Sequence, residues 1–331
     1  MRVSAVQYHL HTIRSFDEFA AQVTHYVKTA QEFDAEFVLF PEFFTTQLLS
    51  IPLDDGRQAT IDDLPNYTEK YTELFVSLAK DTGMYLIGGT HVIRQNGKLY
   101  NVAHLFTPDG HIHQQAKLHI TPTEVNEWNI APGDGVHVFE TDKATIAILT
   151  CYDIEFPEIV RMARAKGADV IFCPSCTDDR HGFYRVRYCC HARAIENEVY
   201  VVTTGTVGSL PTVDFMRANF GQAAVITPND IPFPQSASLR RARSTATWSL
   251  PLTLTCRSFA KCGKKDRSRH GATGALICIQ TGTRWRNSGG PSPRLRAEVP
   301  RGGCGRTKRV RRRDMCWHPN QSRVRHPFAS S

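Results

Sequence analysis

The residue that most clearly suggests a chemical reaction is Cys151, which follows an apolar stretch at residues 146–149. This stretch predicts a buried strand, and Pro157 fits the first turn of a helix that we expect to begin at Glu155. A cysteine at the end of a strand, just before a helix, can be held rigidly and still meet a substrate. Most isolated cysteines are buried core residues, so Cys151 indicates catalysis only together with other residues.

Two charged residues upstream also follow expected strands. Glu42 comes directly after the apolar run at residues 37–41, and Lys117 ends a weakly alternating segment at residues 112–116. Charged residues at strand ends are usually solvated, so neither residue indicates a site by itself. If the fold brings them to Cys151, a nucleophile, a proton acceptor and a fixed positive charge lie in one place.

The segments around these three residues resemble a known family. FPEFF around Glu42, KLHITPTE from Lys117 to Glu124, and TCYDIEFPE around Cys151 match the signature segments of the nitrilase superfamily of carbon-nitrogen hydrolases in order and spacing. Residues 185–211 resemble a later segment of the family, especially in the branch often found beside or fused to an acetyltransferase domain. The resemblance covers about residues 1–235.

This resemblance implies a role for each residue. Cys151 would be the nucleophile and Glu42 the general base and acid. Lys117 would stabilise the oxyanion, and we expect the backbone N–H of Tyr152 to do so as well, because Tyr152 directly follows the nucleophile. We expect the nearby cation and the helix start to favour the ionised form of the Cys151 thiol.

Two further expectations concern the surroundings of these residues. Glu124 matches a second glutamate of the family that positions the others, but Val125 stands where the family often has arginine, which weakens the local ion pairing. Asp153 and Arg161 are expected to form an ion pair that fixes the turn after Cys151.

The elements that position these residues alternate between strands and helices, so the predicted fold class is α/β. Ser15 and Asn66 each precede a glutamate by three residues and so indicate the starts of two helices. Asn96-Gly97 fits a tight hairpin turn. The stacking of two sheets in a four-layer αββα sandwich is implied only by the family resemblance.

Charge divides the chain into two parts. Residues 237–331 hold 22 of the 40 Lys and Arg residues and 3 of the 32 Asp and Glu residues, so their net charge is +19 and that of the rest is −11. Periodic patterns also fade in this region. We therefore interpret residues 1–236 as the carbon-nitrogen hydrolase domain and residues 237–331 as a basic, disordered tail.

A sharper hypothesis is that the tail is a frame-shifted translation of the family's C-terminus. Codons for residues 257–265, read one base later, can encode LLREVREE, which resembles the usual ending of the family. The last strands of the fold would then be missing, leaving a sheet edge uncovered. The homo-oligomer that the family implies would lose its C-terminal interface.

The remaining patterns concern location and cofactors. We expect a cytoplasmic protein with no membrane partner, because no signal-peptide pattern and no apolar run of ~20 residues is present. The ten cysteines favour a reducing compartment over a disulfide scaffold. The sequence contains no phosphate-loop or dinucleotide-binding glycine pattern, so we expect no nucleotide cofactor. Zinc binding by Cys173, Cys176 and the segment 189–191 is conceivable, although this segment is ordinary for the family branch.

These observations predict a cofactor-free thiol hydrolase of non-peptide carbon-nitrogen bonds. Its partners would be water and a small amide or nitrile, with an amidase favoured over a nitrilase. An inactive, truncated family member is one alternative. Polyanion binding through the basic tail, such as residues 306–313, is another, although nucleic-acid binding would be accidental in a frame-shifted tail.

Overall fold

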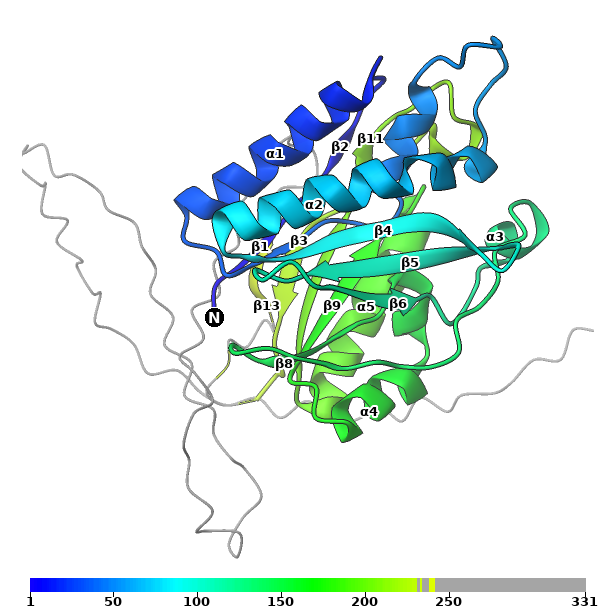
Figure 1. Cartoon of the computed structure of the whole chain (residues 1–331). Helices are drawn as coiled ribbons and strands as arrows, with labels where there is room; N and C mark the ends of the chain where they lie inside the picture. The colour runs from blue at the N-terminus through cyan, green and yellow to red at the C-terminus, as the bar shows by residue number, and fades with distance from the viewer. Residues whose placement is uncertain (231–232, 234–237, 242–331) are drawn as a thin grey trace, which may run out of the picture. The chain divides into compact units, whose positions relative to one another are not determined.

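The computed structural model describes residues 1–230, 233 and 238–241. In this part of the chain two β-sheets lie face to face, with helices on the outer face of each (Figure 1). The expected α/β class and αββα layering are confirmed. The predicted tail, residues 237–331, lies outside the described residues except for residues 238–241, so its disorder and the frame shift stay predictions.

The first sheet has the strand order β1-β3-β4-β5-β6. β1, β3 and β4 are parallel, and β4, β5 and β6 form an antiparallel meander. Its strands are β1 (Val3–Ala5), β3 (Phe37–Leu39), β4 (Tyr85–Gln95), β5 (Lys98–Phe106) and β6 (Ile112–Ala116). Asn96 and Gly97 have φ values of 51° and 76°, which confirms the predicted hairpin turn.

The second sheet has the strand order β13-β12-β10-β9-β8-β7. β8, β9 and β10 are parallel, and the other neighbours are antiparallel. Its strands are β7 (Phe139–Glu140), β8 (Thr145–Ile148), β9 (Val170–Ser175), β10 (Tyr200–Gly205), β12 (Ala224–Ile226) and β13 (Ser238–Arg241). β2 (His9–Leu10) and β11 (Val207–Gly208) pair separately. The edge strand β13 was not predicted.

Three apolar clusters separate the four layers. The middle cluster packs one face of each sheet together, with Phe37 of β3 stacked on Phe172 of β9 at 5.6 Å between ring centroids. A second cluster lies between the first sheet and helices α1 and α2, and a third lies between the second sheet and helices α4 and α5. Strands buried on both faces explain the apolar runs in the sequence, because neither face meets water.

The helices are α1 (Phe16–Glu32), α2 (Thr68–Thr82), α3 (Pro122–Asn126), α4 (Pro157–Ala165) and α5 (Arg180–Asn197). The predicted cap at Ser15 is confirmed, since its hydroxyl accepts from the backbone N–H of Glu18 at 3.3 Å. The cap predicted at Asn66 is wrong. The chain is already helical there, in the 3-10 helix η2 (Ile61–Tyr67), whose capping box is formed by Thr60 and Asp63. Among the described residues no helix is long and apolar enough to cross a lipid bilayer.

Candidate active site

Glu42 lies in a tight turn just after β3, and the neighbouring strand holds this turn in place. Phe43 has a positive φ of 54°, and its backbone N–H donates to the Thr90 hydroxyl of β4 at 3.0 Å. Gly89 has a φ of 58°, and a Cβ there would collide with the carbonyl oxygen of Pro41. The close approach of the two backbones therefore requires glycine at this position. This turn directs the Glu42 carboxylate into the protein, where the Glu42 side chain is 1% exposed.

Lys117 follows β6 directly and points its ammonium group at two carboxylates. Its Nζ donates to Oε1 of Glu42 at 2.8 Å and to Oε2 of Glu124 at 2.6 Å. All three side chains are at most 2% exposed. One cation and two carboxylates thus share a buried centre, which is favourable only where hydrogen bonds satisfy the remaining oxygen atoms.

Glu124 is the third residue of α3 and forms a capping box with Thr121. Its Oε2 accepts from the Thr121 backbone N–H at 2.9 Å and from the Thr121 hydroxyl at 2.8 Å. We expected Val125, in place of arginine, to weaken the ion pairing here. Glu124 instead pairs directly with Lys117, and Val125 is exposed.

Burial and mutual charge set the protonation of this centre. Burial raises the pKa of Glu42, and the charge of Lys117 opposes that shift. Burial also acts against the charged forms of Glu124 and Lys117. The charge of Lys117 outweighs burial and lowers the pKa of Glu124, and the charges of Glu42 and Glu124 outweigh it and raise the pKa of Lys117. Lys117 therefore stays a cation, whereas Glu42 is the more basic of the two carboxylates.

Cys151 opens the 3-10 helix η3 (Cys151–Glu155), three residues after β8. Its φ is 46°, an uncommon backbone conformation for a residue other than glycine, of the kind that clusters at functional sites. The helix predicted to begin at Glu155 begins instead at Pro157, after this short helix.

Asp153 holds the turn after Cys151. Its carboxylate accepts from the backbone N–H groups of Leu118 and His119 at 3.2 and 2.7 Å, and so joins this turn to the segment that carries Lys117. The expected ion pair between Asp153 and Arg161 is wrong, because Arg161 is exposed and the backbone donors occupy the Asp153 carboxylate.

The Cys151 thiol is buried beside the charged centre. Burial and the charge of Glu42 raise its pKa well above the ordinary value, and Lys117 only partly offsets them. Our expectation of a thiolate favoured at rest is therefore wrong. The thiol and the Glu42 carboxylate both bond to the backbone of Cys176, so they lie close together.

The backbone of Cys176 connects the thiol with the carboxylate. Its N–H donates to Oε2 of Glu42 at 2.9 Å, and its carbonyl oxygen accepts from the Cys151 thiol at 3.7 Å from the sulfur atom. Cys176 follows β9 directly, so a residue of the second sheet contacts the carboxylate that β3 of the first sheet delivers. Tyr152 follows Cys151 at the start of η3, and none of the hydrogen bonds found among the described residues uses its backbone N–H.

Aromatic side chains adjoin this centre. The Phe43 ring lies 6.0 Å from Nζ of Lys117, and it contacts Trp128 edge-to-face at 5.5 Å between centroids. Trp128 in turn lies 4.3 Å from Phe215, and both are partly exposed. These three rings form the aromatic wall, which runs from the buried Phe43 beside Lys117 to the partly exposed Trp128 and Phe215.

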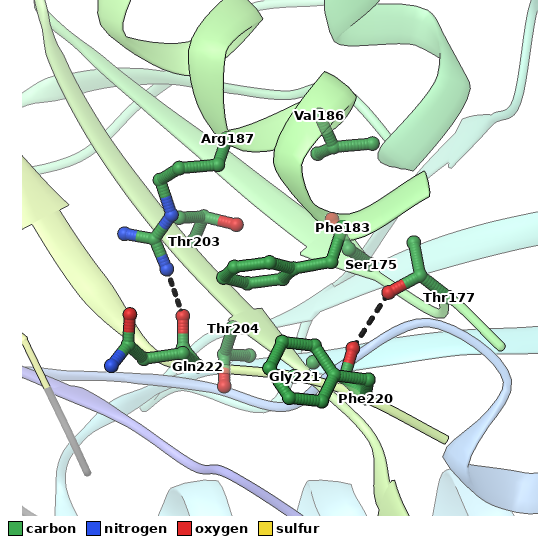
Figure 2. Close-up of a pocket in the computed structure, with 11 residues that line it drawn as sticks. Ser175, Thr177, Phe183, Val186, Arg187, Thr203, Thr204, Phe220, Gly221 and Gln222 are labelled. Atoms are coloured by element: carbon green, nitrogen blue, oxygen red, sulfur yellow. Dashed lines mark hydrogen bonds between the residues drawn. The ribbon is translucent and has the colours of Figure 1, made fainter. Parts of the chain in front are cut away.

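A separate small pocket lies between α5 and the ends of β9 and β10 (Figure 2). Thr203, Thr204 and Phe183 line it, together with Arg187, which donates to the carbonyl oxygen of Gln222. The pocket could hold about one water molecule. Its lining does not include Glu42, Lys117 or Cys151, so we do not assign substrate binding to it.

The zinc alternative receives no geometric support. Within the described part of the chain, no group of three or more His, Cys, Asp or Glu side chains is placed to hold a metal ion. Cys173 is completely buried in β9, and its pKa is raised by hydrogen bonding with Cys190 and by burial.

Sequence reasoning missed one residue of the centre, Asn101 of β5. Its Nδ2 donates to Oε1 of Glu42 at 3.0 Å and to Oε1 of Glu124 at 2.9 Å. The available signal was an asparagine inside a strand of mainly apolar residues, where a buried amide requires a partner.

Comparison with known proteins agrees with this geometry. The family profile described as carbon-nitrogen hydrolase matches residues 2–240. The chain is 47% identical over 233 residues to the probable hydrolase YhcX of Bacillus subtilis, covering 70% of this chain and 45% of the relative. It is 30% identical over 214 residues to omega-amidase NIT2 of Xenopus tropicalis, covering 61% of this chain and 73% of the relative. The chain thus spans less than half the length of the Bacillus relative.

Solved structures share the fold. Nit3 of Saccharomyces cerevisiae, a member of branch 10 of the nitrilase superfamily, matches with a TM-score of 0.60 at 20% identity, over 74% of this chain and 86% of that one. A mutant amidase of Nesterenkonia from the same superfamily matches with a TM-score of 0.58 at 19% identity, over 74% and 87%.

Proposed function

Because this chain belongs to the carbon-nitrogen hydrolase family of the nitrilase superfamily, we propose that it hydrolyses small amides through a covalent intermediate on Cys151. The observation that carries the proposal is the buried centre of Glu42, Lys117 and Glu124, to which the backbone of Cys176 links the Cys151 thiol. This centre combines a nucleophile, a base and a fixed cation. Glu42, Lys117 and Cys151 act in catalysis, with Glu124 and Tyr152 in support.

The first half-reaction forms the thioester. Glu42 takes the thiol proton as the sulfur attacks the amide carbon, so that a C–S bond forms and the carbonyl π electrons move to oxygen. Lys117 and the backbone N–H of Tyr152 stabilise this oxyanion. When the oxyanion collapses, the C–N bond breaks and protonated Glu42 gives its proton to the departing ammonia or amine. The raised pKa of Glu42 suits a group that both accepts and donates a proton near neutral pH.

The second half-reaction releases the acid. Water attacks the thioester carbon while Glu42 takes one of its protons, and the same donors stabilise the second oxyanion. The C–S bond then breaks, the sulfur recovers the proton from Glu42, and the carboxylic acid leaves. The raised pKa of Cys151 means that the resting site holds a neutral thiol, so deprotonation accompanies attack.

The nature of the substrate follows from the surroundings of the site. The omega-amidase relatives support an amide over a nitrile. The aromatic wall of Phe43, Trp128 and Phe215 favours substrates with an apolar part next to the amide. We further propose that the protein is cytoplasmic and homo-oligomeric and belongs to the branch associated with an acetyltransferase domain.

The test measures ammonia release by the purified full chain from a panel of small amides and nitriles, with mass spectrometry to detect the acyl group on Cys151. We expect Cys151→Ala to abolish release and adduct, whereas Cys189→Ala, which changes a partly buried cysteine of α5, retains both. Release that survives Cys151→Ala would refute the mechanism. Turnover of nitriles alone would support a nitrilase, and a folded chain that turns over neither class would support the inactive-member alternative.

A further inference from the structure

Asn101 is an uncharged residue that bonds to both carboxylates of the buried centre, Glu42 and Glu124. Its side-chain amide nitrogen donates to Oε1 of Glu42 at 3.0 Å and to Oε1 of Glu124 at 2.9 Å. Lys117 bonds to the same two residues, through Oε1 of Glu42 and Oε2 of Glu124. The four side chains therefore form a closed ring in which two donors alternate with two carboxylates.

The orientation of the amide follows from its partners. Only the NH2 group can face two carboxylates, because the amide oxygen would repel both of them. The Asn101 oxygen is buried and accepts no hydrogen bond within the described part of the chain. An apolar residue at this position would take the amide donors away from Oε1 of both buried carboxylates.

Charge gives the reason for a neutral donor at this place. Lys117 balances one of the two carboxylates, so the ring retains a net negative charge when both are ionised. A second cation would hold Glu42 permanently ionised and weaken it as a base, whereas a third carboxylate would add repulsion. An amide stabilises both charges moderately and does not titrate.

We propose that Asn101 is a positioning residue, which holds Glu42 at the Cys151 thiol and Glu124 at Lys117 by donating one amide hydrogen to each carboxylate. This inference rests on the proposed function, because it gives Asn101 a role through the base Glu42. Asn101 does not touch the reacting atoms itself. It acts from β5, between β4 and the strand β6 that precedes Lys117.

The test compares Asn101→Leu, which keeps the volume and removes the donors, with the matched control Gln115→Leu. Gln115 is also a buried strand amide, but it bonds to the backbone of Ala116, Gly135 and His137 and to no carboxylate. For Asn101→Leu we expect kcat to fall at least about tenfold with little change in KM, and the acidic limb of kcat/KM to move up by about one pH unit. Asn101→Ser retains one donor and should recover part of the activity.

A second readout does not need activity. The donors of Asn101 stabilise ionised carboxylates, so the loss of thermal stability in Asn101→Leu should grow as pH rises from 4 to 7. The loss in Gln115→Leu should stay constant over the same range. A pH-independent loss in Asn101→Leu together with an unmoved acidic limb would overturn the proposal. If the wild-type chain hydrolyses no amide, the proposed function fails and the positioning role fails with it, while the pH-dependent stability still shows whether Asn101 stabilises the two ionised carboxylates.

Discussion

Removing the ammonium group of Lys117 tests the charge balance of the site most directly. Lys117→Met keeps most of the side-chain volume but leaves Glu42 and Glu124 facing each other without a cation. Both carboxylates are buried. Removing one partner of a buried ion pair costs about 3–5 kcal/mol. At about 2–4 °C per kcal/mol for a domain of this size, the melting temperature at pH 7 should fall by roughly 6–20 °C.

The sign of the pH dependence is also determined. In the wild type Lys117 lowers the pKa of Glu124, and this contribution to stability is present at neutral pH and is lost as pH falls through the folded pKa. Without Lys117 both carboxyl groups have raised pKa values, so the variant loses stability as pH rises. The difference between wild type and Lys117→Met should therefore be largest near pH 7 and narrow toward pH 4.

Thermal and urea denaturation between pH 4 and 7 measure this difference. Lys143→Met is the control, because Lys143 is partly exposed and its pairs with Glu36 and Asp142 should contribute less than about 1 kcal/mol. Adding Glu42→Gln to Lys117→Met removes one of the facing charges and should restore part of the stability. A loss for Lys117→Met that equals the control, or that does not change with pH, would refute the argument for a shared buried charge.

Two other predictions follow from the same region. The kcat/KM of the wild type should decline on the acidic side as Glu42 becomes protonated. Glu42→Gln should lower kcat/KM by about 10²-fold or more, since an amide cannot accept the proton. A Glu42→Gln variant with wild-type activity would exclude Glu42 as the base. Gly89→Ala should destabilise the fold by several kcal/mol, because it adds a collision with Pro41 to the strain of a positive φ. The control is Gly83→Ala, where φ is 67° and the space around the new Cβ is open, and it should cost only about 1–2 kcal/mol. Equal losses in urea denaturation would contradict the close approach at Gly89.

Local patterns in the sequence were sufficient for most of the longer helices and strands and for placing the three principal residues at strand ends. Runs of apolar residues mark β3 and β8, the buried strands that precede Glu42 and Cys151. Lys117 instead follows β6, a mostly exposed edge strand with only weak alternation. The cap at Ser15 and the turn at Asn96-Gly97 were also predictable, because both depend on contacts within a few residues.

Predictions from local sequence were wrong where contacts with other parts of the chain decided the structure. Asn66 has the residue spacing of a helix start, but the preceding segment is already helical and is capped at Thr60. The pairing of Asp153 with Arg161 was judged from charge alone. Backbone N–H groups that arrive from the segment after Lys117 bond to Asp153 instead.

The amino-acid sequence by itself determined the α/β class, the order of the strands along the chain and which strand ends carry a thiol, a carboxylate and an ammonium group. Only the tertiary structure decided that Lys117 lies between two carboxylates, that Asn101 bridges them and that Cys176, 134 positions from Glu42, donates to it. It also decided that burial and the charge of Glu42 raise the pKa of the Cys151 thiol. Protonation and partner choice depend on burial and on which strand ends meet in space, and neither is a property of neighbouring residues in the chain.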